Sequence, residues 1–337
     1  MNVVKFICVA IMIFVHAHMM LVTNANYGFD STSGFFYKIT DKFMFLTLFV
    51  LLLPLLAGYV FRINDDYEFK KAIKIAIFLL FVGFLMNIVI WGVKYVFSWN
   101  VLQLIGLSFV IIAFLMKSFS ERAIFLSSLT AVLMAPLLRN LLININENYF
   151  INILIGNIDR SMLWPFFPWF GVVGFGFLFA HYQLKSKNDF KFKIISLFTG
   201  IAFLIFAAVK NEISPPLNRN FVWSSDIFQP ETGFVLATIG LFLVLSVLGM
   251  TFFNKIKLKK YGIVNSYSKG ILWIYVLMMF MNSVFYSSRR ESLPLNKPTF
   301  IYLMWMIFIF IFSWIVGVLC IKLSEKRLTV FFKKINR

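Results

Sequence analysis

The sequence predicts an all-α, polytopic integral membrane protein with about ten transmembrane helices and both termini in the cytoplasm. Of the 337 residues, 61% are hydrophobic and only 14% are charged, whereas a soluble domain carries about 25% charged residues. Apolar runs recur along the chain at lengths of about 20 residues, which is the length that a helix needs to cross a bilayer. Because lipid admits only helices or closed barrels, these runs indicate a bundle of membrane helices.

The segments follow one another without an internal repeat or a recognisable soluble domain. We therefore treat residues 1–337 as a single transmembrane domain, with a retained first helix rather than a cleaved signal peptide. The expected segments are 4–24, 41–62, 70–93, 100–117, 121–141, 163–183, 193–210, 231–253, 269–287 and 299–322.

The basic residues decide the orientation. Of the 32 lysines and arginines, 22 fall in alternate linkers and at the two ends of the chain, on the side that holds the N-terminus. The positive-inside rule places that side in the cytoplasm. The net charge of +18 lies between membrane segments, so we expect membrane lipids and phosphates as partners and no nucleic acid. Cys8 and Cys320 both lie in apolar segments, which predicts no disulfide.

The first segment contains two of the three histidines, and an ionisable side chain within a membrane helix is costly enough to suggest function. His16 and His18 are two residues apart, so they point about 200° away from each other on a helix. The His16 face also carries Met12, Val9, Cys8 and Lys5, whereas the His18 face carries the bulky Phe14, Ile11 and Ile7. We therefore expect His16 to face the interior and His18 to reach the interface. The alternative for His16 is a neutral imidazole bonded to a neighbouring helix.

Other polar features are fewer. Asn87, Gln103 and Arg139 lie in apolar runs and each needs a partner, with Arg139 expected near the outer interface.

Pro165 and Pro168 predict a helix start, which Asp159 or Ser161 could cap. The glycines that follow permit close helix approach. His181 is expected at a solvated helix end. The long outer linkers 25–40, 140–162 and 211–230 either wall a pocket or cover helix ends, and the alternation in 140–162 suits a short strand or an interfacial segment.

Four stretches resemble a known superfamily, the transmembrane acyltransferases. They are similar above all to bacterial relatives of the heparan-α-glucosaminide N-acetyltransferase catalytic domain, and more widely to the acyltransferase-3 family. The opening helix has a basic residue eleven positions before a histidine, and the other stretches resemble a Leu-Gln-Arg-Ile-Gly run, an Asp…Pro…Pro-Trp-Gly helix entry and a Leu…Tyr…His helix. The stretches are KFICVAIMIFVH (5–16), KKAIKIAIFLLFVGFLMN with NVLQLIGLS (70–87 and 100–108), DRSMLWPFFPWFG (159–171) and YGIVNSYSKGILWIYVLM (261–278).

The resemblance implies acyl transfer from a cytoplasmic acyl-CoA, acetyl-CoA above all, to a hydroxyl or amine of a glycan or glycolipid at the outer face of a bacterial inner membrane. His16 would be the general base, and no metal is implied. The positions expected to bind the donor are Lys5, Lys70, Lys71, Lys74 and Gln103. The positions expected to bind the acceptor are Asp159, Trp164, Trp169 and Tyr275.

Three positions depart from the family pattern. Lys5 and Leu104 stand where arginine is usual, and Met278 stands where a late histidine is common. Two alternatives therefore remain open beside the enzyme: a transporter or flippase for a lipid-linked sugar, and a family member whose site has decayed. The four lysines could also serve orientation alone. The oligomeric state is left open, with a homodimer as one option.

Overall fold

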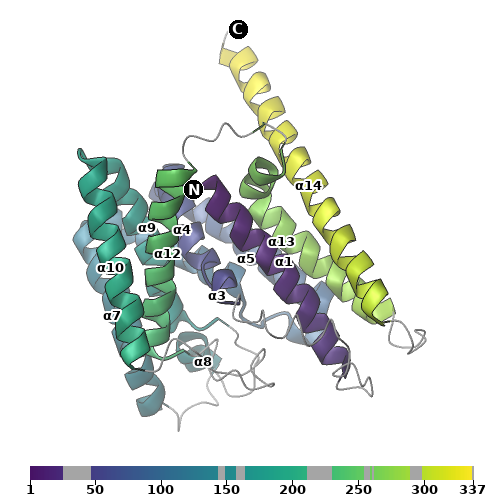
Figure 1. The fold of residues 1–337 in the computed structure, drawn as a ribbon, viewed down its shortest axis with the longest axis horizontal. Helices are drawn as coiled ribbons and strands as arrows, with labels where there is room; N and C mark the ends of the chain where they lie inside the picture. The colour runs from purple at the N-terminus through teal and green to yellow at the C-terminus, as the bar shows by residue number, and fades with distance from the viewer. Residues whose placement is uncertain are drawn as a thin grey trace. The chain divides into compact units, whose positions relative to one another are not determined.

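The protein is all-helical in the part of the chain that its computed structural model describes, namely residues 1–25, 47–142, 149–156, 164–210, 230–253, 259, 262–288 and 298–335. Helices occupy all ten of the predicted membrane segments (Figure 1). Seven of the described helices are long and apolar enough to cross a membrane: α5, α6, α7, α10, α12, α13 and α14. The chain is thus a multi-pass membrane protein by length and composition, and the full count of ten spans stays a prediction.

The chain divides into two compact units. Unit 1 holds residues 1–50 and 248–337, and unit 2 holds residues 51–247. Unit 1 contains α1 (Asn2–Ala25), α3 (Thr47–Val50), α13 (Ile263–Ser288) and α14 (Pro298–Ile335). Unit 2 contains α4 (Leu53–Ile63), α5 (Phe69–Trp91), η3 (Val93–Tyr95), α6 (Val101–Ser118), α7 (Glu121–Leu142), α8 (Tyr149–Ile155), α9 (Phe166–Lys185), α10 (Asp189–Val209) and most of α12 (Thr232–Phe252).

Helices α1, α13 and α14 pack together in unit 1. Helix α1 runs parallel to α13, because Ser268 donates a hydrogen bond to Asn2 at one end (2.9 Å) and His16 contacts Tyr275 further along. The Tyr267 hydroxyl ties α13 to α14 by donating to the Phe310 carbonyl (2.5 Å). The start of α1 and the end of α14 lie toward the same end of unit 1 (Figure 1). The cytoplasmic assignment of that end stays a prediction.

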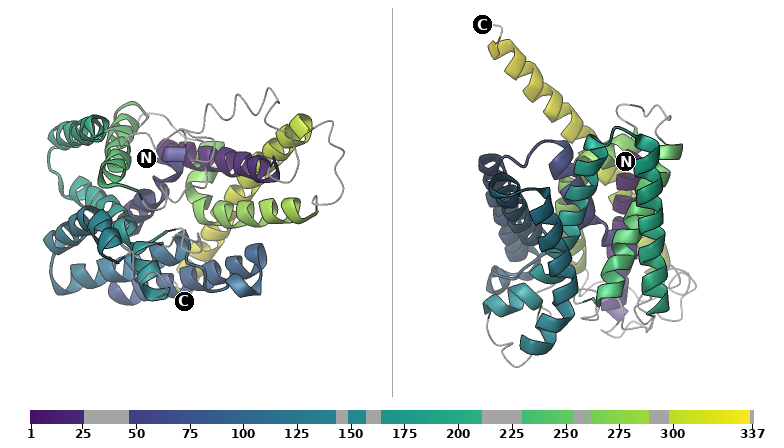
Figure 2. Two further views of the ribbon diagram at one scale, coloured as in Figure 1. Left: turned by 90° about the horizontal axis from the view of Figure 1, so that it is seen from below. Right: turned by 90° about the vertical axis from the view of Figure 1, so that its left-hand side faces the viewer.

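Helix α9 forms the centre of unit 2, where it packs against α4, α6 and α7. Trp169 and Phe177 of α9 are fully buried. A Cβ atom at Gly58 would overlap the Val173 carbonyl, and one at Gly176 would overlap the Leu55 carbonyl. Each of the two helices therefore needs glycine where it meets the backbone of the other. Elsewhere in the unit, α10 and α12 run side by side in both views (Figures 1 and 2) and meet at Gly200 and Gly240.

The structure corrects several predicted boundaries. The predicted span 41–62 holds two helices, α3 and α4, because Pro54 has no amide hydrogen to continue a helix, and residues 41–46 lie outside the described part. Helix α8, not a strand, occupies the described residues 149–155 of the linker 140–162, for which a short strand was one alternative. Helix α14 continues to Ile335 rather than ending at 322.

The start of α9 also differs from the expectation. The helix begins at Phe166 with Pro165 in the N-cap position, and within the described residues no side chain caps it. Pro165 thus holds the N-cap position that was predicted for Asp159 or Ser161. Both of these residues lie outside the described part of the chain, so a contact of their side chains with the helix start stays a prediction. The glycine prediction is confirmed, because Cβ atoms at Gly171 and Gly174 would both meet Ser128 of α7.

The predicted orientation can be tested with single cysteines in a background that lacks Cys8 and Cys320. A cysteine in place of Ser186, between α9 and α10, should resist an impermeant thiol reagent added outside intact cells. A cysteine in place of Lys94, between α5 and α6, should react. The reason is that several lysines surround Ser186, and the positive-inside rule places such a lysine-rich α9–α10 connection in the cytoplasm. Labelling of the cysteine at position 186 but not of the one at position 94 would show that the orientation is the opposite of the predicted one. Permeabilised cells provide the control that both cysteines are reactive.

Candidate functional site

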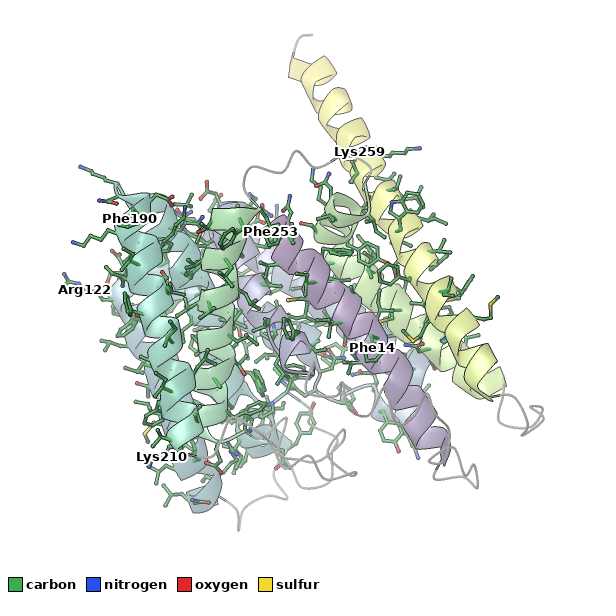
Figure 3. The ribbon with its side chains drawn as sticks, in the orientation of Figure 1. Phe14, Arg122, Phe190, Lys210, Phe253 and Lys259 are labelled. Atoms are coloured by element: carbon green, nitrogen blue, oxygen red, sulfur yellow. The ribbon has the colours of Figure 1, made fainter. Side chains whose placement is uncertain are left out.

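The His16 face of α1 is buried as predicted. Cys8, Val9 and Met12 are 0% exposed, whereas Phe14 on the opposite face is partly exposed (labelled in Figure 3). His16 itself, like Phe14, has intermediate exposure, so the burial of this face is carried by Cys8, Val9 and Met12. The helical period therefore identifies the interior side of this helix correctly. The side chain of His18 lies outside the described part, so its interfacial position stays a prediction.

A hydrogen bond fixes the state of the His16 ring. Nδ1 lies 2.9 Å from the carbonyl oxygen of Met12, one turn earlier in the same helix. A carbonyl can only accept, so Nδ1 carries the proton. In the neutral ring, Nε2 then has the free lone pair, which is the arrangement that a general base requires. The partner is thus the backbone of α1 itself, rather than the neighbouring helix of the alternative hypothesis.

Tyr275 of α13 lies beside His16. The two ring centroids are 6.4 Å apart and the ring planes meet at 79°, an edge-to-face contact. The structure therefore brings together one predicted catalytic residue and one predicted acceptor-binding residue from segments that are far apart in the sequence. Met278, one turn beyond Tyr275, is 2% exposed. The position where the family commonly has histidine thus faces the interior of the protein.

Asn282 extends the same face of α13 by a further turn. It is fully buried, and its Oδ1 accepts a hydrogen bond from the Trp305 indole (3.0 Å). Its Nδ2 donor is buried without a hydrogen-bond partner among the described residues. A buried donor without a partner is costly and is available for a ligand. Asn282 was not among the predicted site residues, although a single amide within the apolar run MMFMNSVF was a visible signal.

Lys5 lies about three turns before the histidine on the same helix. It is partly buried and within electrostatic range of Lys269, near the start of α13. Two ammonium groups at the beginnings of two packed helices create a positive site, although neither has the bidentate geometry of arginine. In unit 1 the structure therefore places Lys5 and His16 on one helix, eleven residues or about 16 Å apart.

The remaining predicted donor-binding residues lie in unit 2. Lys70, Lys71 and Lys74 are exposed at the beginning of α5, and Lys71 pairs with Asp66 (2.9 Å). Gln103 is fully buried and belongs to the N-terminal cap of α6. Its Oε1 accepts a hydrogen bond from the backbone N–H of Asn100 (3.1 Å), and its Nε2 donates to the Ser98 carbonyl (3.3 Å). Both ends of this side chain thus have protein partners.

Asn87 and Asn100 complete the polar network around Gln103. The Asn87 amide donates to the carbonyls of Val96 (3.1 Å) and Ser98 (2.5 Å), and its oxygen accepts from Asn100 (2.8 Å). The prediction that Asn87 needs a partner is confirmed. Three amide side chains thus satisfy the backbone where the α5–α6 connection turns.

The predicted acceptor-binding tryptophans are core residues of unit 2. Trp169 is 0% exposed, and its ring centroid lies 4.8 Å from that of Trp164 in a T-shaped contact. The Trp164 carbonyl accepts a hydrogen bond from the Trp99 indole (2.8 Å). Their part in acceptor binding stays a prediction.

Arg139, near the end of α7, donates a hydrogen bond to the Pro230 carbonyl (2.5 Å), which supplies the partner that its position required.

His181 corrects the prediction of a solvated residue. It is 1% exposed, because it stacks on Phe177 with centroids 6.0 Å apart. Its Nδ1 accepts a hydrogen bond from Arg62 Nε (3.1 Å). Arg62 also pairs with Asp65 (2.6 Å). The position at a helix end suggested exposure, but α4 covers this end.

The described residues include no cluster of three or more histidines, cysteines or acidic residues that could hold a metal ion. The fold and the site define a polytopic helical membrane protein with a histidine on the buried face of its first helix. A family model described as heparan-alpha-glucosaminide N-acetyltransferase, catalytic, matches residues 1–210.

The chain belongs to that family, which makes it a membrane acyltransferase of the acetyltransferase type. The match includes α1 with His16 and the helices α4 to α10. No curated protein and no solved structure matches the chain.

Proposed function

We propose that the protein transfers an acetyl group from cytoplasmic acetyl-CoA to a hydroxyl or amine of a glycan or glycolipid at the outer face of a bacterial inner membrane, with His16 as the general base. The observation that carries the proposal is the bond from His16 Nδ1 to the Met12 carbonyl. This bond leaves Nε2 as the basic atom on the buried face of a membrane helix in a family of acetyltransferases.

The reaction follows from the position of that atom. His16 Nε2 takes the proton of the acceptor hydroxyl or amine as its oxygen or nitrogen attacks the thioester carbonyl. When the resulting tetrahedral adduct collapses, the bond from carbon to sulfur breaks and the coenzyme leaves as a thiolate. The protonated His16 then returns its proton to the thiolate, so atoms and charges balance. Tyr275 and the free amide donor of Asn282 would orient the acceptor on the outer side of His16.

The donor would approach from the opposite end of α1. Lys5 and Lys269 offer positive charge there for the phosphates of the coenzyme. Lys70, Lys71 and Lys74 belong to unit 2, and their part in donor binding stays a separate prediction. The rise of about 16 Å from Lys5 to His16 takes the thioester past the middle of a hydrocarbon core of about 30 Å. An extended pantetheine arm can span such a depth, so the acetyl group would cross the membrane while the coenzyme stays on the inner side.

Vesicles of known orientation test the proposal. Acetyl-CoA with a radiolabelled acetyl group, supplied only on the cytoplasmic face, should label a glycan or glycolipid acceptor on the other face. Free CoA should appear on the side where the donor was added. Vesicles that carry the His16→Ala variant serve as the control for other acetyltransferases.

Two outcomes would contradict the proposal. Labelling that requires donor on the outer face would reject the sidedness. Movement of a lipid-linked sugar across the membrane without a gain of label would identify a transporter instead.

A further inference from the structure

Unit 2 contains a cavity of about 650 Å³ that the catalytic proposal does not use. Its walls come mainly from one face each of α9 and α10, and Ile239, Phe242 and Leu243 of α12 contribute to its lining. The contributing residues of α10 recur every three or four positions, which is the spacing of a single helical face. They are Lys191, Phe192, Ile195, Ser196, Thr199 and Phe203, preceded by the N-cap residue Asn188.

The cavity is apolar over most of its length and basic at one end. From Lys191 to Phe203 the α10 wall covers about 18 Å, slightly more than half of a hydrocarbon core of about 30 Å. Lys185, Lys187 and Lys191 line the end near the α9–α10 connection. Lys185 pairs with Glu121 (3.1 Å), whereas Lys187 and Lys191 make no ion pair within the described residues.

The exposed surface of α10 shows how a ligand reaches the cavity. Phe198 and Val209 on this helix are 68% and 76% exposed, as expected of a helix that faces lipid. Ile195, which lines the cavity, is itself 54% exposed. The cavity therefore opens sideways through a lipid-facing surface. In Figure 3, Phe190 and Lys210 mark the two ends of α10, and the basic end of the cavity lies near Phe190.

We propose that this cavity, the α9–α10 cleft, binds one anionic phospholipid, with an acyl chain between the two helices and the phosphate at Lys187 and Lys191. The apolar length fits one leaflet, and the unpaired lysines fit a negative headgroup at the membrane surface. Basic pockets between membrane helices bind anionic headgroups in this manner. The lateral opening favours a lipid over a water-soluble phosphate compound, which would enter from the aqueous phase.

The test uses the full chain in phosphatidylcholine nanodiscs that contain a small fraction of phosphatidylglycerol with a photoreactive diazirine in one acyl chain. Crosslinks mapped by mass spectrometry should fall on 175–182 of α9 and 192–203 of α10. Lys191→Ala should lower this labelling about fivefold, the effect of one lysine near an anionic headgroup. Lys193→Ala is the matched control, because Lys193 lies outside the cavity and pairs with Asp189 (2.5 Å).

A second pair of variants tests the chain site. Thr199→Trp should remove the crosslinks by filling the cavity, whereas Phe198→Trp, on the exposed face of the same helix, should leave them unchanged. Three results would overturn the proposal: equal labelling by a phosphatidylcholine probe, equal labelling in the Lys191→Ala variant, or displacement of the probe by CoA or inorganic phosphate. Displacement by CoA would assign the cleft to the donor.

Discussion

Replacement of His16 by alanine should lower the rate of acyl transfer by about 10²- to 10⁴-fold, the usual contribution of a general base. The Met12 carbonyl holds the Nδ1 proton, so Nε2 alone can take the proton of the acceptor. The measurement is transfer of radiolabelled acetyl groups in membranes with equal amounts of each variant. His18→Ala is the control, because helix geometry places it about 200° away, and it should retain most of the activity.

A second substitution separates chemistry from structure. His16→Asn offers an amide N–H close to the position of Nδ1, so the bond to the Met12 carbonyl can persist, but it has no basic nitrogen. We expect this variant to fold like the natural protein and to be as inactive as His16→Ala. Activity close to that of the natural protein in His16→Asn would show that His16 only stabilises α1, and the general-base assignment would be wrong.

The positions of the helices could be predicted because a membrane span is set by the length of an apolar run. The side of α1 that is buried could also be predicted, since period alone places Cys8, Val9 and Met12 on the face of His16. The sequence also contains the pattern of the Asn100–Gln103 capping box, although Gln103 was predicted to bind the donor. The break before Pro54 was signalled by the proline.

Long-range partners could not be predicted in the same way. Arg62 and His181 are 119 positions apart, and no local pattern indicates that α4 covers the end of α9. The contact between His16 and Tyr275 was not predicted, because the resemblance gave each residue only a role of its own. The contact depends on the parallel packing of α1 and α13. The α9–α10 cleft depends on the spacing between two helices, which the sequence does not contain.

Replacement of Gly176 by alanine should destabilise unit 2 more than the addition of one methyl group at any other position of α9. A Cβ atom there would overlap the Leu55 carbonyl and approach other backbone atoms of that residue. Backbone in a packed helix pair cannot rotate away, so α4 and α9 would have to separate. Overpacking of this kind costs about 1–3 kcal/mol and occasionally more, and we expect the upper part of that range. Gly58→Ala, which meets the Val173 carbonyl from the other helix, should behave alike.

Gly174→Ala provides the matched control on the same helix. Its Cβ would meet the hydroxyl of Ser128, and a serine side chain can change rotamer at a cost of about 1 kcal/mol or less. Thermal unfolding of the purified variants in one detergent should therefore give the order natural protein, Gly174→Ala, Gly176→Ala from highest to lowest midpoint. If Gly176→Ala unfolds at the same temperature as Gly174→Ala, then α4 and α9 are not packed backbone to backbone, and the description of α9 as the centre of unit 2 is wrong.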